Sequence, residues 1–295
     1  MKLEGKVAIV AGGGQGIGEG IAVCLAEEGA DIAVVDINGN TADRVAKSVE
    51  EKGRKGLAIA ADLTDAEAVN ASVKKALDHF GTLDILVNSV GGASEEMGRM
   101  EYEARLAAED KSLPPFMYQS PELWDKQYHL NLKSHVMMSQ AVAPHFIKQK
   151  SGKIINISSV SGRLPETGVF PYAAMKAGDI SITWSLARSL APYNINVNCI
   201  CPGFVYTPLW ERGAVADYNA MRAAKAEGKL PERFAGFEEL TPKELWLRKT
   251  VNPITPLGRD QTTEDMGRAA VFLVSEDAKN ITGQVLHVDG GRIMR

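Results

Sequence analysis

A tyrosine and a lysine four residues apart, Tyr172 and Lys176, form a pattern that could carry acid–base chemistry. Residues at positions i and i+4 lie on one face of a helix, so this spacing holds a phenol beside an ammonium group. A nearby cation favours the phenolate form, which brings a tyrosine towards the range useful for proton transfer. The same spacing also arises by chance on solvated helices, so the pair gains meaning only from its context.

A glycine-rich segment near the start of the chain has the composition of a phosphate-binding turn. It comprises Gly12, Gly13, Gly14, Gln15, Gly16, Ile17 and Gly18. It follows a predicted strand and opens a predicted helix. Glycine lets the backbone turn tightly and approach a pyrophosphate, whose charge is met by free N–H groups at the helix N-terminus. The alternative interpretation is a βα turn that binds no ligand.

Asp36 ends the second predicted strand, 18 residues after Gly18. That spacing is near the one expected for the carboxylate that holds an adenosine ribose. Such a carboxylate accepts hydrogen bonds from both ribose hydroxyls and repels a 2′-phosphate. Neither Gln15 nor Ile37 supplies a positive charge to offset the repulsion, so the sequence predicts NAD in preference to NADP. The alternative role for Asp36 is to cap a helix.

Short β-branched runs alternate with longer helical ones along the chain. We predict strands at 6–11, 31–36, 57–61, 83–88, 153–158, 196–200 and 284–288, and helices at 17–25, 41–52, 65–80, 121–150, 172–191 and 263–275. Apolar strands that alternate with helices imply a parallel sheet covered on both faces. No repeat or Pro/Gly linker divides residues 1–295. We therefore expect one α/β domain, a doubly wound Rossmann-type sheet.

Two long segments interrupt the alternation, at about 92–120 and 207–255. Long excursions inside a compact domain are usually functional lids or disordered. The second segment contains helix-favouring stretches at 218–229 and 242–249. It also has large apolar side chains to bury, namely Trp210, Phe234, Phe237, Leu245 and Trp246. We expect both segments to enlarge the substrate pocket, the second as an ordered lid. The alternative, a scaffold that binds a partner protein, predicts an exposed apolar patch around Trp210 and Trp246.

Composition limits the classes of function. The net charge of −4 over 295 residues gives no electrostatic reason to expect nucleic acid or an anionic membrane as a partner. The chain has no run of about 18 apolar residues and no charged leader, so we expect a cytoplasmic protein with no membrane span. Its three cysteines and five histidines show no metal-ligand spacing, so no metal is predicted.

Taken together, these motifs resemble those of the short-chain dehydrogenase/reductase family over residues 6–291. The resemblance implies cofactor-binding positions at Gly12, Gln15, Gly16, Ile17, Gly18, Asp36, Asp62, Leu63, Asn88, Gly91, Tyr172, Lys176, Pro202, Gly203, Val205 and Thr207. Departures from the family pattern are Ala11, where threonine is usual, and Ser89-Val90 after Asn88. We expect these to affect cofactor affinity slightly and the reaction type not at all.

The family's catalytic residues correspond to Asn131, Ser159, Tyr172 and Lys176. The resemblance implies that Tyr172 exchanges a proton with the substrate hydroxyl, that Ser159 stabilises the substrate oxygen, and that Lys176 keeps Tyr172 ionisable. Asn131 would position a water in a proton relay. Ser158 is the rival of Ser159, but neighbouring strand residues face opposite sides and the 13-residue spacing to Tyr172 favours Ser159.

The sequence therefore predicts NAD-dependent hydride transfer to or from a small secondary alcohol or ketone, including cyclic and aromatic ones. Residues 207–255 hold eight basic and seven acidic residues, and 92–120 hold three and six. Neither segment has the basic excess that would grip a phosphopantetheine group. The main alternative is a 3-oxoacyl thioester reductase acting on ACP or CoA substrates, often with NADPH, which Asp36 disfavours. A nucleotide-binding regulator without turnover is a further alternative, although no catalytic residue is lost. By resemblance we expect a homotetramer assembled through the 121–150 and 172–191 helices and the closing strand.

Overall fold

The computed structural model describes residues 1–92, 114–165 and 169–294. The first of the two long segments lies mostly outside these ranges, so the expectation that it forms part of the pocket is not addressed by the described residues. The described ranges contain every predicted site residue. They form an α/β fold with one parallel sheet.

Seven parallel strands form the sheet in the order β3-β2-β1-β4-β5-β6-β7. Their bounds are β1 Val7–Ala11, β2 Asp31–Asp36, β3 Gly56–Ala60, β4 Ile85–Asn88, β5 Gly152–Ile157, β6 Ile195–Pro202 and β7 Val285–Val288. All seven predicted strands are confirmed. The strand order reverses between β1 and β4, and ligands of doubly wound sheets bind beyond the carboxyl ends of the strands at such a point.

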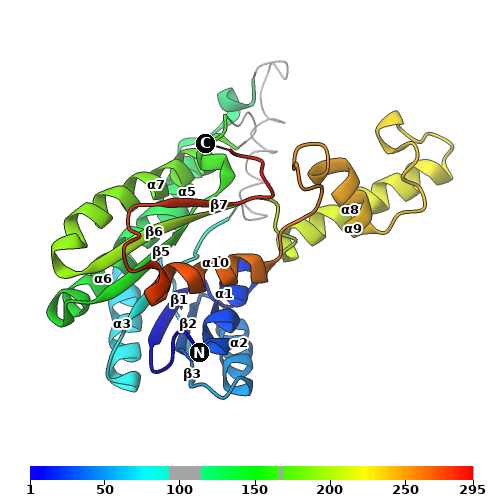
Figure 1. Cartoon of the computed structure of the whole chain (residues 1–295). Coiled ribbons are helices and arrows are strands. Elements are labelled where there is room, and N and C mark those ends of the chain that lie inside the picture. The colour runs from blue at the N-terminus through cyan, green and yellow to red at the C-terminus, as the bar shows by residue number, and fades with distance from the viewer. Residues whose placement is uncertain (93–113, 166–168, 295) are drawn as a thin grey trace.

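Helices cover both faces of the sheet (Figure 1). On one face lie α1 (Gly16–Glu27), α2 (Gly39–Glu51) and α10 (Thr263–Val274); on the other lie α3 (Ala66–Phe80), α6 (Ser134–Gln149) and α7 (Phe170–Leu190), with α5 (Pro121–Tyr128) leading into α6. Short 3-10 turns occur at Pro115–Tyr118, Val160–Gly162, Ala191–Tyr193, Glu232–Phe234 and Glu276–Ala278. Strand β1 shows why there are two apolar layers, because Ala8 and Val10 face one layer while Val7, Ile9 and Ala11 face the other. The Rossmann-type prediction is confirmed.

The helix predicted over 121–150 is interrupted. Between α5 and α6, His129–Lys133 forms one π-helical turn. A π turn inserts one extra residue into a helix and often occurs at functional sites. Its centre is Asn131, which is fully buried.

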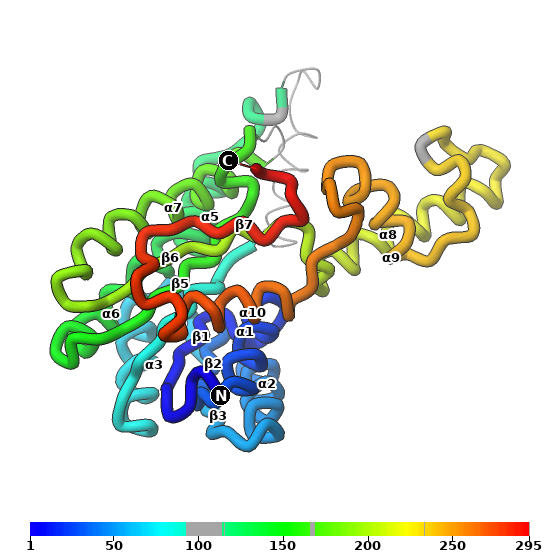
Figure 2. The backbone as a smooth tube through the Cα atoms, viewed as in Figure 1, coloured from blue at the N-terminus to red at the C-terminus, as the bar shows by residue number. Residues whose placement is uncertain are grey.

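The second long segment forms an arm, residues 207–255, that extends away from the sheet (Figures 1 and 2). It contains α8 (Pro208–Ala226), α9 (Pro242–Trp246) and a π-helical turn at Leu247–Val251. Helix α8 starts ten residues before the predicted 218–229 helix, with a proline in its first turn, where the missing N–H has no helical partner to lose.

Two small apolar clusters hold the arm together. One joins Phe204 to Ala214, Trp246 and Val251, and the other joins Met221, Phe234 and Leu245. Neither cluster includes a buried residue of the sheet core. The arm is therefore ordered around its own core. None of the described helices combines the length and apolar character that a membrane crossing needs.

Candidate active site

The glycine segment forms a tight turn at the carboxyl end of β1. Gly12 and Gly16 have φ angles of +74° and +58°, a region that favours glycine. A Cβ atom on Gly12 would lie 2.8 Å from the backbone nitrogen of Val90, and one on Gly18 would overlap the carbonyl oxygen of Gly12. The segment thus brings the backbone of β1, the β4 loop and helix α1 into close contact.

The N-terminus of α1 is open towards this turn. Gln15 is the N-cap residue, and its side chain makes no capping hydrogen bond with the first-turn N–H groups. Ile17 packs against the core behind them. The acid in the first turn, Glu19, forms an ion pair with Arg44 of α2, whose guanidinium also donates to the carbonyl of Gly14 at 3.0 Å. The negative charge that would repel a phosphate at this helix end is therefore compensated.

Asp36 lies beside the same turn. Its Oδ2 accepts a hydrogen bond from the Gly14 N–H at 2.9 Å, and its Oδ1 accepts one from the Asn38 N–H at 3.0 Å. The helix cap of α2 is Asn38 rather than Asp36. Both carboxylate oxygens are consequently held in place at the end of β2, the position expected for a ribose-binding acid.

Three further residues that the family resemblance implies as nucleotide contacts are Asp62, Leu63 and Asn88. Asp62 is exposed, with Oδ1 accepting from the N–H and hydroxyl of Thr64, and Leu63 is buried. The side chain of Asn88 is directed elsewhere, since it is fully buried and donates to Asn156 Oδ1 at 2.8 Å. Any cofactor contact at Asn88 must therefore come from the backbone, because its amide joins β4 to β5 inside the sheet layer.

The loop after β6 approaches the glycine turn. Pro202 ends β6, and the N–H of Gly203 donates to Val288 O at 3.1 Å. Val205 is buried, and Thr207 starts α8 without using its side chain as a cap. A Cβ on Gly16 would lie 3.5 Å from the Thr207 methyl group. The hydroxyl of Thr207 is thus available beside the turn.

Ser159 follows β5, and its surroundings distinguish it from Ser158. The hydroxyl of Ser158 donates to the backbone carbonyl of Lys176 at 2.6 Å, so it faces helix α7. Ser159 Oγ accepts a hydrogen bond from the N–H of Ser161 at 3.1 Å. That bond leaves the hydroxyl proton of Ser159 free to donate to a substrate oxygen. The geometry favours Ser159 over Ser158, in agreement with the choice made from spacing.

Tyr172 and Lys176 lie together at the start of α7. The Lys176 ammonium is 5.9 Å from the centroid of the Tyr172 ring. Lys176 is 3% exposed, and it donates to Ile157 O at 2.9 Å and to Asp179 Oδ2 at 3.0 Å. Burial disfavours the ammonium form, but the negative charges of Asp179 and Tyr172 outweigh burial, so the pKa of Lys176 is raised above its ordinary value.

Asn131 is joined to the β4 loop rather than to Tyr172. Its Oδ1 accepts from the Gly92 N–H at 2.7 Å, while its Nδ2 donates to Gln127 Oε1 at 2.6 Å and to Gly92 O at 3.3 Å. A Cβ on Gly91 would lie 2.5 Å from Asn131 Oδ1 and 3.2 Å from Lys176 Nζ. The backbone of Gly91 therefore lies beside both the Asn131 side chain and the Lys176 ammonium. Both polar atoms of the Asn131 amide make hydrogen bonds within the protein.

Two residues that the sequence analysis did not select complete this site. Asp179 Oδ1 lies 2.8 Å from His135 Nδ1, and both side chains are fully buried. His135 is one of the five histidines for which the sequence predicts no metal-binding role. Asp179 lies three residues after Lys176, and an ionisable residue in an otherwise apolar helix face is the signal that could have found it. No group of three His, Cys, Asp or Glu side chains among the described residues is arranged to hold a metal ion.

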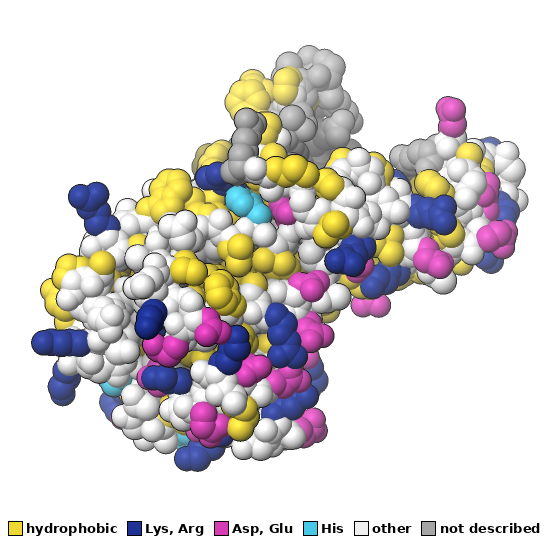
Figure 3. Space-filling view, viewed as in Figure 1, with side chains coloured by type: hydrophobic (Ala, Val, Ile, Leu, Met, Phe, Trp, Pro, Cys, Tyr) yellow, Lys and Arg dark blue, Asp and Glu magenta, His cyan; other side chains and the backbone are white. Residues whose placement is uncertain are grey.

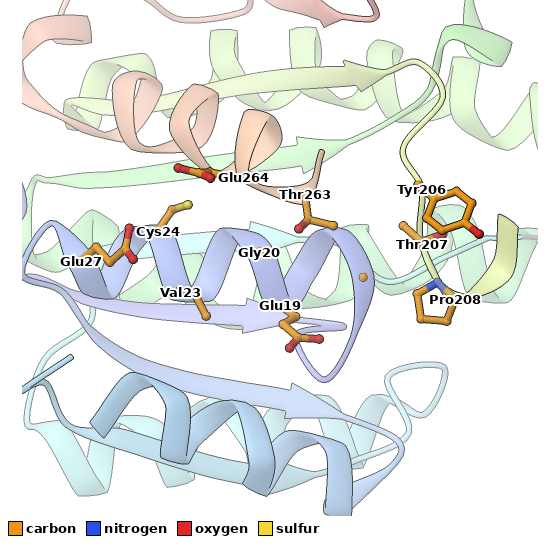
Figure 4. Close-up of a pocket in the computed structure, with 11 residues that line it drawn as sticks. Glu19, Gly20, Val23, Cys24, Glu27, Tyr206, Thr207, Pro208, Thr263 and Glu264 are labelled. Atoms are coloured by element: carbon orange, nitrogen blue, oxygen red, sulfur yellow. The ribbon is translucent and has the colours of Figure 1, made fainter. Parts of the chain in front are cut away.

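A cavity of about 420 Å³ lies apart from Tyr172, along the outer side of α1 (Figure 4). Gly16 and Thr207 form one end, and Glu19, Glu27 and Glu264 line the rest. The carboxylates of Glu27 and Glu264 pair with Arg268, and that of Glu27 also pairs with Lys52. None of the predicted catalytic residues lines this cavity, so it extends from the glycine turn without being the chemical centre of the site.

The sequence of residues 6–215 matches the family described as short chain dehydrogenase. The chain belongs to the short-chain dehydrogenase/reductase family. A second match, over residues 240–292, is to the family described as enoyl-(acyl carrier protein) reductase.

Relatives of this short-chain dehydrogenase cover its whole length. The 3-oxoacyl-[acyl-carrier-protein] reductase FabG of Thermotoga maritima is 32% identical over 100% of both chains. The (2S)-[(R)-hydroxy(phenyl)methyl]succinyl-CoA dehydrogenase subunit BbsD of Thauera aromatica is 31% identical over 99% of this chain and 98% of its own. Both relatives are named for oxidoreductases that act on thioester substrates.

Solved structures of the family agree with the fold. NAD+-bound xylitol dehydrogenase superposes with a TM-score of 0.79 at 27% identity, covering 99% of this chain and 100% of its own. A 7α-hydroxysteroid dehydrogenase complexed with NADH and 7-oxo glycochenodeoxycholic acid has a TM-score of 0.76 at 28% identity, covering 100% and 96%. The short-chain dehydrogenase described here is therefore an oxidoreductase with a Rossmann-type sheet.

Proposed function

We propose that this protein is an NAD-dependent dehydrogenase or ketoreductase that transfers hydride between NAD and the carbinol carbon of a small secondary alcohol. The observation that carries the proposal is the buried ammonium of Lys176, held between Ile157 O and Asp179 with the Tyr172 ring 5.9 Å away. A buried cation stabilises the phenolate form of a neighbouring tyrosine, which suits that tyrosine for proton exchange with a substrate.

The residues present fit a dinucleotide. At Gly12, Gly13, Gly14 and Gly18 the turn has no room for a Cβ atom, and the open N-terminus of α1 offers N–H groups to a pyrophosphate. The fixed carboxylate of Asp36 suits the hydroxyls of an unphosphorylated adenosine ribose. Two structural relatives were solved with NAD+ or NADH, which supports NAD as the cofactor. Arg44 is the one nearby cation on α2 that could favour NADP, but Glu19 pairs with it.

The proposed roles follow from these positions. Bound NAD would accept or supply the hydride. Tyr172 as phenolate would take the proton of the substrate hydroxyl, and Ser159 would donate a hydrogen bond to the substrate oxygen, where charge develops. Lys176 would stabilise the phenolate. Asn131 would fix the β4 loop through Gly92, so its role is to position that loop rather than to hold a proton.

The arm supports a small or weakly charged substrate. Several of its basic side chains pair with acids, as in Lys225–Glu239, Lys249–Asp217 and Lys243–Asp260. On the side of the arm seen in Figure 3, basic and acidic side chains are interspersed. We propose that the arm is the lid over the substrate, and that the protein acts in the cytoplasm as a homotetramer without nucleic-acid or membrane partners.

A second candidate is 3-oxoacyl thioester reduction, which the FabG relatives favour. Their names describe acyl-carrier-protein substrates, and the BbsD relative is named for a CoA thioester. This candidate shares the site and the reaction class. It differs in the length of substrate that the arm must admit.

A binding and turnover experiment tests the proposal. NAD+ and NADP+ are titrated separately by intrinsic fluorescence, and secondary alcohols and 3-hydroxyacyl-CoA thioesters are then screened by absorbance of the reduced nicotinamide. Tighter NAD+ binding with turnover of small alcohols, abolished in Tyr172→Phe, supports the first candidate. Turnover of thioesters alone moves the assignment to the second. Failure to bind either nucleotide removes both.

A further inference from the structure

A buried ionic network lies behind Lys176. The carboxylate of Asp179 is divided between two partners, with Oδ2 at 3.0 Å from Lys176 Nζ and Oδ1 at 2.8 Å from His135 Nδ1. Asp179 and His135 are fully buried, and Lys176 is 3% exposed. Charges in such a site are weakly screened, so the total charge of the three groups acts strongly on any neighbour.

The surroundings of His135 determine how many protons the network holds. Its Nε2 lies 2.8 Å from the backbone carbonyl of Val90, which can only accept a hydrogen bond. Its Nδ1 faces Asp179 Oδ1, and an ionised carboxylate is also only an acceptor. With one proton on the imidazole, at Nε2, both Nδ1 and Oδ1 lack a donor, and two buried acceptors face each other. Satisfying both contacts requires one additional proton between His135 and Asp179.

That proton changes the charge seen by Tyr172. Asp179 alone would neutralise Lys176, and the phenolate of Tyr172 would lose the cation that stabilises it. With the additional proton, the His135–Asp179 pair is neutral and the positive charge of Lys176 stays uncompensated. The additional proton lies between His135 Nδ1 and Asp179 Oδ1 and satisfies both atoms.

We propose that His135 and Asp179 are positioning residues whose shared proton lets Asp179 hold Lys176 in place without cancelling its charge. The proposal rests on the proposed function, in which Tyr172 works as a phenolate. The network spans α6 and α7, and through Val90 it reaches the loop that also contacts Asn131. Among the described residues, the further ionisable group near Lys176 and Asp179 is Cys199 on β6, whose contact with Cys201 and burial raise the pKa of its thiol. Cys199 is therefore a neutral neighbour at the pH of the test.

Three variants separate charge from structure. His135→Asn can still donate an N–H towards Asp179 but carries no charge, so Lys176 becomes neutralised. Asp179→Asn can accept from Lys176 and donate to a neutral His135, so the positive charge remains. The double variant His135→Asn/Asp179→Asn also keeps that charge. We expect the midpoint of the pH profile of alcohol oxidation to rise by about one unit in His135→Asn. We expect Asp179→Asn to lie close to the wild type and the double variant to return towards it.

The control is Ser139→Ala. Ser139 lies one turn after His135 on α6, is equally buried and bonds to Asn88 and to the His135 carbonyl, but it does not contact Asp179. It should lose stability without shifting the pH midpoint. A purely structural role for the network predicts lower activity with unshifted midpoints in the single variants and a further loss in the double variant, and that pattern would overturn the proposal.

Two spectroscopic measurements do not depend on turnover. Nitrogen-15 NMR of histidine-labelled protein, without cofactor, should show both ring nitrogens of His135 protonated near neutral pH. Carbon-13 NMR of labelled tyrosine, assigned with Tyr172→Phe, should show the Tyr172 titration moving to higher pH in His135→Asn and back in the double variant. A neutral His135 ring beside an ionised Asp179, or an unmoved Tyr172 titration, overturns the inference. If no alcohol is turned over but both NMR results hold, only the proposed function has failed.

Discussion

The hydroxyl of Ser158 donates a 2.6 Å hydrogen bond to the backbone carbonyl of Lys176, whereas the neighbouring Ser159 Oγ accepts a hydrogen bond from the N–H of Ser161. Two adjacent serines at the end of β5 thus have separate tasks. Ser158 joins the strand to the helix that carries Tyr172, whereas Ser159 keeps a free proton.

The serine pair yields a first prediction. Ser159→Ala should lower kcat about 100- to 1000-fold, the usual cost of removing a donor to a developing oxyanion, with little change in stability. Ser158→Ala should leave kcat nearly intact and lower the free energy of unfolding by about 1 kcal/mol. Steady-state kinetics and urea unfolding measure the two effects. If Ser158→Ala proves the more damaging to kcat, the assignment of the two serines is wrong.

Removing the phenol hydroxyl should separate binding from chemistry. Tyr172→Phe should reduce kcat by at least about 100-fold, because general acid–base catalysis contributes that much, while NAD+ binding changes little. Rapid-mixing kinetics and fluorescence titration of the same preparation give both values. Retention of turnover would mean that another group exchanges the proton.

The cofactor preference should depend on the carboxylate of Asp36. In Asp36→Asn, one oxygen and the negative charge are lost, so NAD+ should bind about tenfold more weakly and NADP+ more tightly than in the wild type. Asn38→Ala is a suitable control, since it removes the α2 cap and leaves the Asp36 carboxylate. The measurement is the ratio of the two dissociation constants. A wild type that prefers NADP+ contradicts the argument, and Arg44 would then be the first residue to examine.

The stability of the arm should depend on the side chain of Trp246. Trp246 is 4% exposed and contacts Phe204, Tyr206 and Trp210. Trp246→Ala should destabilise the arm by about 3–5 kcal/mol, as large core truncations do. Proteases should then cleave first within 208–251, and KM for the substrate should rise while the Kd for NAD+ stays constant. A parallel loss of NAD+ affinity would show that the arm also shapes the nucleotide site.

A buried thiol gives a pH-dependent prediction. Cys24 of α1 packs against Gly267 of α10. Burial raises the pKa of its thiol from 9.0 to about 11. The unfolded chain therefore releases this proton before the folded one does. The stability due to the protonated thiol is fully present below pH 9 and is lost as the pH rises from 9 to 11.

The measurement is the free energy of unfolding across that interval. The wild type should lose up to about 3 kcal/mol to this group, and Cys24→Ala should lack that component of the decline. The thiol should also resist alkylation at pH 8. Rapid alkylation of the folded protein would indicate that α1 and α10 separate readily.

The sequence predicted the strands and the nucleotide turn well because these depend on local pattern. Strand β2 is an apolar run flanked by Asp31 and Asp36, and Gly18 is required by one close approach to Gly12. Asn88 shows the limit of such matching. Its position in the motif suggested a cofactor contact, but whether its amide faces the ligand or Asn156 depends on the neighbouring strand.

Pairs distant in the sequence could not be predicted. Arg44 and Glu19 are 25 residues apart, and His135 and Asp179 lie on different helices. A lone histidine or aspartate in a helical pattern has several possible partners, and only the packing of α6 on α7 selects one. The start of α8 was missed for a related reason, since residues 208–217 become helical by packing on α9 rather than through a strong local pattern.

The arm has its own core, and this has a consequence for how enzymes of this shape can diversify. Substitutions at Met221 or Leu245 affect packing within the arm and leave the apolar layers of the sheet untouched. Under the proposed function, new substrate preferences can accumulate in α8 and α9 while the hydride chemistry proposed at Tyr172 is inherited unchanged. The boundary at Thr207, where the β6 loop enters α8, is the natural place for exchange of whole arms between relatives.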